Sequence, residues 1–76
     1  MVHRYHINLF WSEADACWIA DVPDLTHCSA HGPTPEAALR EVETAIDAWL
    51  SVQAELGRPA PAARYRPAIY AARDAA

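Results

Sequence analysis

The pattern of apolar and polar residues follows a two-residue period at the start of the chain and a helical period in its middle. Residues 2–11 alternate, which predicts a β-strand. Residues 12–16 are short and polar and fit a hairpin loop, and residues 17–22 are predicted to form the returning strand because they are rich in aromatic and β-branched residues. One face of the first strand is expected to carry Tyr5, Ile7, Leu9 and Trp11, while the opposite face carries Arg4, His6 and Asn8, with Phe10 as an apolar exception.

Turn signals follow the second predicted strand. Pro23 cannot donate a backbone hydrogen bond to a neighbouring strand, so the strand is expected to stop before it, and Pro23-Asp24 opens a turn. A short third strand around residues 28–31 would complete an antiparallel meander, which Gly32-Pro33 closes.

The strongest pattern is that of a helix beginning at Pro35. Thr34 is an N-cap candidate, and Pro35 fits the first helical position because its missing N–H needs no partner there. Glu36 lies near the positive end of the helix dipole. Gly57 is expected to end the helix. Apolar residues at helical spacing form one stripe, Ala38, Leu39, Val42, Ala45, Ile46, Trp49, Leu50 and Leu56.

The sequence therefore predicts an α+β fold in which one long helix packs on one face of an antiparallel sheet of three to four strands, in the order β-β-β-α. Residues 1–57 form this domain, and residues 58–76 are a tail rich in Pro, Ala and Arg. Two alternatives stay open for the tail. Its residues 65–70 add a fourth, edge strand, or the tail is an arm over a neighbouring subunit.

The size of the chain also bears on its assembly. With 76 residues, 53% of them hydrophobic, it holds one folded domain at most. A chain this small seldom buries enough apolar surface alone, so a homo-oligomer, either a dimer or a tetramer, is expected.

The charges are segregated along the chain. Residues 1–56 carry nine acidic residues and two arginines, a net charge of −7, whereas residues 57–76 carry four arginines and one aspartate, a net charge of +3. An acidic body repels phosphate, so direct binding of nucleic acid is not expected. It suits the surface of a basic protein instead.

The start of the chain has no apolar signal segment, and no apolar run is long enough to span a bilayer. The two cysteines, Cys17 and Cys28, are expected to be reduced thiols. We therefore expect a cytoplasmic protein with no membrane contact.

The best candidate for chemistry is the run His27-Cys28-x-x-His31, with Cys17 on the adjacent strand. Thiolate and imidazole groups bind zinc, but this spacing matches no standard metal-binding motif. In a strand, Cys28 and His31 would point to opposite faces. The favoured interpretation is a small buried cysteine beside exposed histidines, with no catalytic residues, metal or cofactor.

Two motifs and a cysteine between them occur in a specific order. Trp18–Leu25 fits aromatic-x-A-x-V-P-D-L, and Gly32–Leu39 matches G-x-T-x-E-E-A with Ala37 in place of the second Glu. Over about residues 5–61, this order resembles the HicB antitoxin family in its small single-domain form. The motif residues, whose physical roles are to end strands, bend the chain and cap the helix, are Trp18, Ala20, Val22, Pro23, Asp24, Leu25, Cys28, Gly32, Thr34, Glu36 and Ala37.

The resemblance implies a partial ribonuclease-H-like fold and a non-enzymatic role. It implies that the chain belongs to a bacterial type II toxin–antitoxin system and neutralises a small basic HicA-like toxin, which cleaves mRNA, by binding it directly. Because only 15 residues follow Pro61, no DNA-binding module is expected. The candidate contacts with the toxin are exposed acids, Glu13, Asp15, Glu43 and Asp47. The alternative function is a stand-alone oligomeric ligand-binding or scaffold module with no toxin partner.

Overall fold

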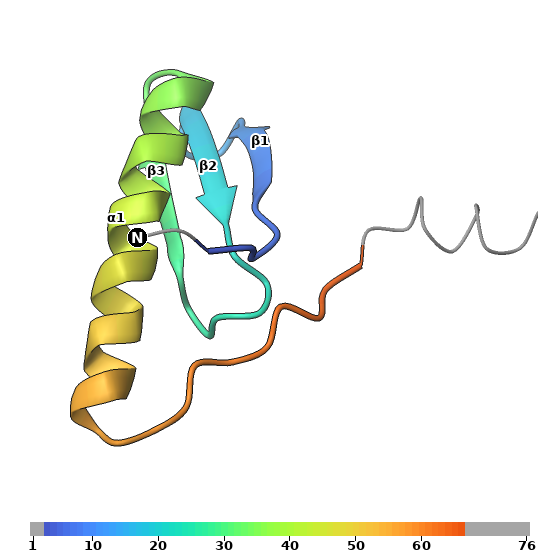
Figure 1. The fold of residues 1–76 in the computed structure, drawn as a ribbon. Coiled ribbons are helices and arrows are strands. Elements are labelled where there is room, and N and C mark those ends of the chain that lie inside the picture. The colour runs from blue at the N-terminus through green and yellow to red at the C-terminus, as the bar shows by residue number, and fades with distance from the viewer. Residues whose placement is uncertain (1–2, 67–76) are drawn as a thin grey trace, which may run out of the picture.

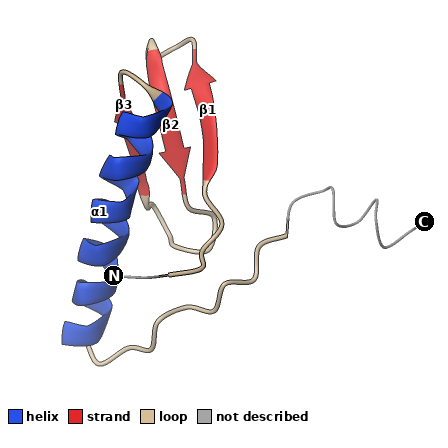
Figure 2. Ribbon diagram, turned by 45° about the horizontal axis from the view of Figure 1, so that its top comes forward, coloured by secondary structure: helices blue, strands red, loops and turns tan. Residues whose placement is uncertain are grey.

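The structure is a computed structural model that describes residues 3–66. Within these residues, β1 (Asn8–Ser12), β2 (Cys17–Asp21) and β3 (Ser29–Gly32) form an antiparallel sheet in the order β1-β2-β3. The helix α1 (Pro35–Glu55) packs on one face of the sheet, nearest to β3 and β2, and β1 forms the far edge (Figures 1 and 2). The predicted α+β fold, in the order β-β-β-α, is confirmed.

The first strand is shorter than the alternation predicts. A strand is predicted from near the start of the chain, whereas β1 spans only Asn8–Ser12. Its partner β2 ends at Asp21, opposite the first residue of β1, so residues 3–7 have no strand to pair with. Tyr5 and Ile7 still pack against the core, because the alternating pattern brings both side chains to the same side.

The register of the strands gives the sheet two different faces. Residues directly opposite one another in neighbouring strands share a face. The face toward α1 carries one aligned row of Leu9, Ala20 and Ala30, and the uncovered face carries the next row, Phe10, Ile19 and His31.

The core lies between the sheet and α1 and is small. It is built from both layers and from the loop between β2 and β3, and its buried members are Ala20, Val22, Leu25, Cys28, Ala38, Val42 and Ile46. Leu39 and Leu56, which belong to the predicted apolar stripe of α1, are 38% and 57% exposed. The stripe therefore extends beyond the surface that the sheet covers, at Leu39 within α1 and at Leu56 just after its last residue.

The loop between β2 and β3 is held by a chain of backbone hydrogen bonds. The N–H of Leu25 donates to the carbonyl oxygen of Val22 at 3.2 Å, and the N–H of Cys28 donates to that of Leu25 at 3.2 Å. The N–H of Val22 in turn donates to the carbonyl oxygen of Cys28 at 3.0 Å. All three side chains are buried, so this part of the sequence motif builds the core.

Both ends of α1 carry the caps that the sequence predicts. The Thr34 hydroxyl oxygen accepts a hydrogen bond from the N–H of Ala37 at 3.1 Å, and Pro35 is the first helical residue. At the other end, Gly57 has φ 70° and its N–H donates to the carbonyl oxygen of Ala54, while the N–H of Arg58 donates to that of Gln53. These two bonds form a Schellman motif.

Residues 58–66 form neither helix nor strand and run back toward the start of the chain (Figure 1). The hydroxyl of Tyr5 donates a hydrogen bond to the carbonyl oxygen of Pro61 at 2.6 Å. The rings of His6 and Tyr65 lie with their centroids 4.6 Å apart. The first half of the tail is thus attached to the segment that precedes β1.

Asp24 provides a second attachment for the tail. Its Oδ2 accepts hydrogen bonds from the backbone N–H groups of Arg64 and Tyr65, each at 3.1 Å. Residues 65 and 66 lie outside the sheet, and the remainder of the edge strand predicted over 65–70 lies outside the described residues. The aspartate of the V-P-D-L motif therefore ties the tail to the β2–β3 loop.

We expect the change Asp24→Ala to loosen the tail, because it removes the acceptor of both hydrogen bonds. Bonds to a half-exposed carboxylate contribute about 1 kcal/mol, so trypsin should cleave after Arg64 about fivefold faster. Limited proteolysis followed by mass spectrometry measures this rate. Glu13→Ala, which removes an exposed carboxylate from the β1–β2 turn, is the control. An unchanged rate for Asp24→Ala would mean that Tyr5 and Tyr65 hold the tail without it.

Candidate protein-binding surface

The four candidate contact acids lie on two separate elements. Glu13 and Asp15 belong to the turn between β1 and β2, and both are exposed. Glu43 is exposed on α1, whereas Asp47, one turn further along, is half-buried and less accessible than the sequence suggests. The structure thus places these acids at the hairpin turn and on the helix, and does not gather them into one cluster.

Asp15 also has a role within the hairpin turn. The Ser12 hydroxyl donates to Asp15 Oδ2 at 3.1 Å, and the N–H of Asp15 donates back to that hydroxyl oxygen at 3.2 Å. These bonds support a four-residue turn in which Ala16 has φ 52°. Glu13 and Glu43 are therefore the stronger candidates for contact with a partner, because Asp15 supports the turn and Asp47 is half-buried.

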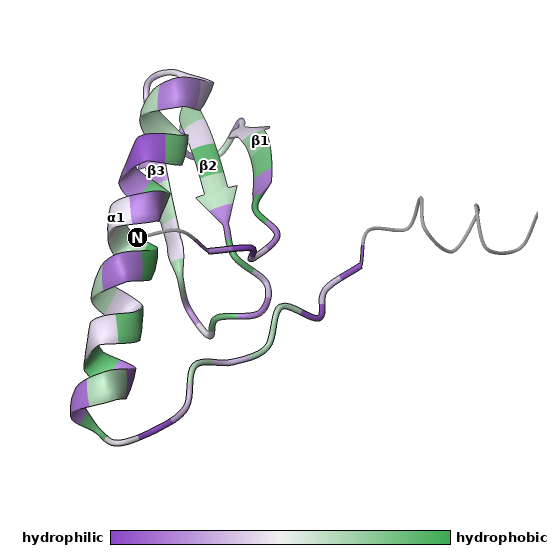
Figure 3. Cartoon of the chain, viewed as in Figure 1, coloured by the Kyte–Doolittle hydropathy of each residue, from purple (hydrophilic) through white to green (hydrophobic). Residues whose placement is uncertain are grey.

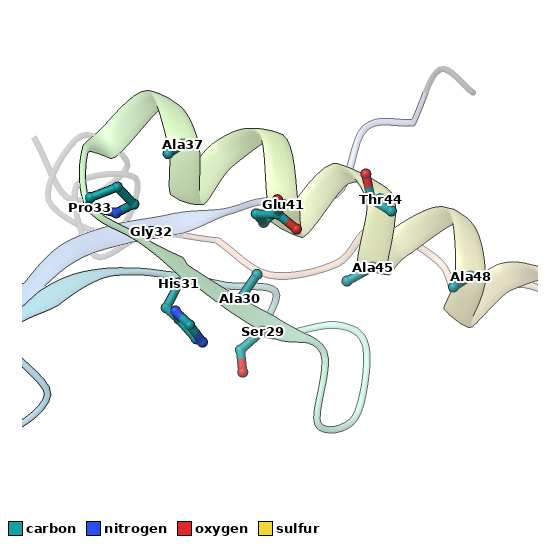
Figure 4. A pocket seen from close by; sticks show the side chains of 10 residues that line it. All are labelled: Ser29, Ala30, His31, Gly32, Pro33, Ala37, Glu41, Thr44, Ala45 and Ala48. Carbon is teal, nitrogen blue, oxygen red and sulfur yellow. The ribbon is translucent and has the colours of Figure 1, made fainter.

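A groove runs between the free edge of β3 and the adjoining flank of α1 (Figure 4). Its volume is about 590 Å³. Small side chains leave this space open, and Figure 4 shows Ala30 pointing toward the helix while Ser29 and His31 point away. The charged residue at the groove is Glu41. The groove is lined by Ser29, Ala30, His31, Gly32, Pro33, Ala37, Glu41, Thr44, Ala45 and Ala48.

The end of this groove is fixed by a close approach between β3 and α1. A Cβ atom added to Gly32 would lie 2.6 Å from the backbone nitrogen of Ala38 and 2.8 Å from the Cβ of Ala37. Only a glycine fits here, so the third strand and the first turn of the helix are in direct backbone contact. The sequence motif G-x-T therefore sets the distance between the two layers.

The His27-Cys28-x-x-His31 run is not brought together. Cys28 is buried in the core, His27 has φ 58° and is exposed in the loop before β3, and His31 is exposed on the uncovered face of the sheet. Cys17 lines a hollow of about 390 Å³ on that face together with His31, Asp15 and Ile19. Among residues 3–66, no three His, Cys, Asp or Glu side chains are grouped closely enough to hold a metal ion.

The two thiols have different environments. Burial raises the pKa of the Cys28 thiol above its ordinary value of 9.0, and the negative charge of Asp21 raises it further. Cys17 is half-buried on the surface of the sheet. We expect iodoacetamide to alkylate Cys17 in the folded chain and to spare Cys28, because the thiolate is the reactive form. Mass spectrometry of the modified peptides measures the two rates, and equal rates would contradict this expectation.

The raised pKa of the Cys28 thiol predicts how the free energy of unfolding depends on pH. The unfolded chain loses the Cys28 proton near pH 9.0, while the folded chain holds it to higher pH. The stability that this thiol contributes is therefore fully present below pH 9.0 and is lost as the pH rises toward the folded pKa. Urea unfolding on both sides of this pH measures the loss, and Cys28→Ala should reduce the slope.

An aromatic pair lies across β1 and β2. Trp11 and Trp18 are direct cross-strand partners, and their rings meet edge to face with centroids 5.9 Å apart and planes at 72°. Trp18 packs against the core, while Trp11 remains 45% exposed. The third tryptophan, Trp49, donates its Nε1–H to the carbonyl oxygen of Thr26 at 3.0 Å. Trp18 and Trp49 therefore contribute to packing, and Trp11 lies at the edge of the sheet.

Two features of this surface are not predicted by the motifs or by the apolar pattern of the sequence. The Asp24 attachment joins residues that lie 40 positions apart, and the motif gives no sign of it. The groove along β3 depends on alanines of α1, which are distant from β3 in the sequence but face it in the fold. Its one sequence signal is the run of small residues at helical spacing on α1, Ala37, Ala45 and Ala48.

Comparisons with protein-family models, curated proteins and solved structures gave no significant match. In the described part of the chain, no helix combines the length and the apolar character that crossing a bilayer requires.

Proposed function

We propose that this chain is a protein-binding module that binds a small basic protein through its acidic surface. We further propose that it is the antitoxin of a bacterial type II toxin–antitoxin pair of the HicB and HicA kind and that it acts in the cytoplasm. The observation that carries the proposal is the charge of the domain. Residues 1–56 have a net charge of −7, and the two proposed contact acids, Glu13 at the hairpin turn and Glu43 on α1, are exposed.

The positions of the motif residues support a binding role over a catalytic one. Val22, Leu25 and Cys28 form the core, Gly32 sets the approach of the helix, and Thr34 caps it. Each of these residues has a structural task. Among residues 3–66, the surface that these residues leave free includes exposed acids, a groove and an apolar strand.

A chain that neutralises a toxin by binding it does not itself need to catalyse a reaction. A protein that cleaves RNA binds phosphates with basic side chains, and those side chains are attracted to carboxylates. An acidic domain that occupies this surface competes with RNA for the same charges and covers the site sterically. Opposite charges also speed the encounter, so association should slow as salt rises.

The test is a pull-down of the full chain from its native cells at low and high salt, followed by an RNA cleavage assay with the purified partner. We expect a stoichiometric small basic protein that is released by salt, and whose RNA cleavage stops when this chain is added. The double variant Glu13→Gln/Glu43→Gln should slow association about tenfold. Glu41→Gln/Glu55→Gln removes the same charge elsewhere and is the matched control.

Recovery of the chain with itself alone would overturn the antitoxin proposal and favour the second candidate, a stand-alone oligomeric ligand-binding or scaffold module. The groove of about 590 Å³ between β3 and α1 is the observation that favours this candidate. Equal slowing by the two double variants would show that total charge, and not the position of Glu13 and Glu43, determines association.

A further inference from the structure

The edge strand β1 lacks two of the features by which natural sheets protect their edges, charge and proline. Its three central residues, Leu9, Phe10 and Trp11, are 40%, 47% and 45% exposed. The strand contains no charged residue and no proline, which are the usual means of blocking further strand pairing. Figure 3 shows its apolar stretch at the margin of the sheet, and Figures 1 and 2 show that the described part of the tail passes below it.

The hydrogen bonds of β2 determine which way the backbone of β1 points. The N–H of Val22 donates to the carbonyl oxygen of Cys28, which continues the β2–β3 ladder by one pair. Hydrogen-bonded pairs alternate along an antiparallel ladder, so Ala20 bonds toward β3 and Ile19 bonds toward β1.

Phe10 is the partner of Ile19, so its backbone groups point toward β2. Those of Leu9 and Trp11, on either side, point outward to the open edge. The backbone donors and acceptors at this edge therefore belong to residues that are also large, apolar and exposed.

We propose that β1 is the contact between two copies of this chain, which pair antiparallel about a two-fold axis at Phe10. This register pairs all five residues of β1, from Asn8 to Ser12. Leu9 of one copy lies opposite Trp11 of the other, so the outward backbone groups bond to each other. The two Phe10 rings meet on the uncovered face, and two three-stranded sheets become one six-stranded sheet.

Charge favours a second copy as the occupant of this edge. The segment 5–12 contains no Asp, Glu, Lys or Arg, whereas the exposed side of α1 carries Glu36, Glu41, Glu43 and Glu55. Two chains that each carry a net charge of −4 repel least where this uncharged strand meets itself. A basic partner, in contrast, gains nothing from an edge without carboxylates.

The exposed area predicts a dimer that dissociates on dilution. The uncovered parts of the three side chains amount to about 300 Å² per copy, or about 600 Å² in total. Complexes that bury less than about 1,200 Å² are usually weak or transient. We therefore expect monomer and dimer to exchange in the micromolar range of concentration.

Sedimentation velocity of the full chain over a series of concentrations tests the proposal. We expect a reversible monomer–dimer equilibrium. Phe10→Glu places two like charges on the two-fold axis and should abolish the dimer, with the helical circular dichroism unchanged because Phe10 lies outside the core. Leu56→Glu adds the same charge at an apolar residue that is 57% exposed at the end of α1, and should leave the dimer intact.

Disulfide trapping tests the register. In a Cys17→Ser background, Phe10→Cys should form a disulfide-linked dimer with oxidised glutathione, because residues that face each other in a non-hydrogen-bonded pair have closely spaced Cβ atoms. Leu9→Cys is the control and should link far more slowly, since its opposite residue is Trp11. A chain that is monomeric at every concentration, a dimer that survives Phe10→Glu, or faster linking through Leu9 would each overturn the proposal.

Discussion

Replacing Gly32 by alanine should destabilise the chain by about 3 kcal/mol. The added Cβ would lie 2.6 Å from the backbone nitrogen of Ala38 and 2.9 Å from the carbonyl carbon of Ala37. These are backbone atoms of the first helical turn, so no side chain can rotate away, and either the helix or β3 must shift. A domain of this size is stabilised by only about 4–11 kcal/mol in total, so urea unfolding followed by circular dichroism should show the loss clearly.

Gly57 provides a matched glycine for comparison. It has φ 70° with no atom within 4 Å of an added Cβ, so its glycine is needed for backbone conformation and not for space. Gly57→Asn should cost a few tenths of a kcal/mol, because asparagine tolerates the left-handed region. If Gly32→Ala were as mild as Gly57→Asn, then β3 and α1 would not be in the direct contact described above.

The second large effect is expected at Ile46, whose side chain is fully buried between α1 and the sheet. Ile46→Ala should cost about 3 kcal/mol, since it removes apolar contacts and leaves a cavity in a core of few residues. Ile46→Val removes one methylene and should cost about 1 kcal/mol. The same urea experiment measures both.

Val52 lies on the same helix and is 52% exposed, which makes Val52→Ala the control. Its cost should remain within about 0.5 kcal/mol. Equal costs at Ile46 and Val52 would contradict the placement of the core on one side of α1.

The elements of the fold and both ends of the helix follow from local patterns, whereas the start of β1 follows from its pairing with β2. Thr34, Pro35 and Gly57 define the helix because capping depends on a few neighbouring residues. The start of β1 cannot be found in this way. Residues 3–7 alternate like a strand, but the length of β2 decides where pairing begins.

The candidate site was predictable only in part. Exposed acids such as Glu13 and Glu43 follow from composition and helical spacing, whereas the half-buried position of Asp47 depends on how α1 is rotated against its surroundings. The groove along β3 and the Asp24 attachment join segments that are distant in the sequence. The alanines at helical spacing on α1 are the one local signal of the groove, and no local pattern indicates the Asp24 attachment.

The two proposals concern different parts of the molecule. Glu13 at the hairpin turn and Glu43 on α1 would bind a basic partner, and the apolar edge of β1 would bind a second copy. A two-fold dimer presents each acidic surface twice, so a dimer should bind two partner molecules. Phe10→Glu is therefore expected to halve the number of partners in each complex without weakening the binding of each.

The Trp11–Trp18 pair gives the hairpin an optical signal of its own. Two indole rings held edge to face at 5.9 Å couple their electronic transitions, and coupled transitions produce a paired positive and negative circular dichroism band. This band overlaps the far-ultraviolet bands of the helix, so the contribution of the hairpin is the part of the spectrum that is lost when one of the two rings is replaced. Since Trp11 lies in β1, a change in this band on dilution would report, without any label, the separation of the β1 strands of the two copies.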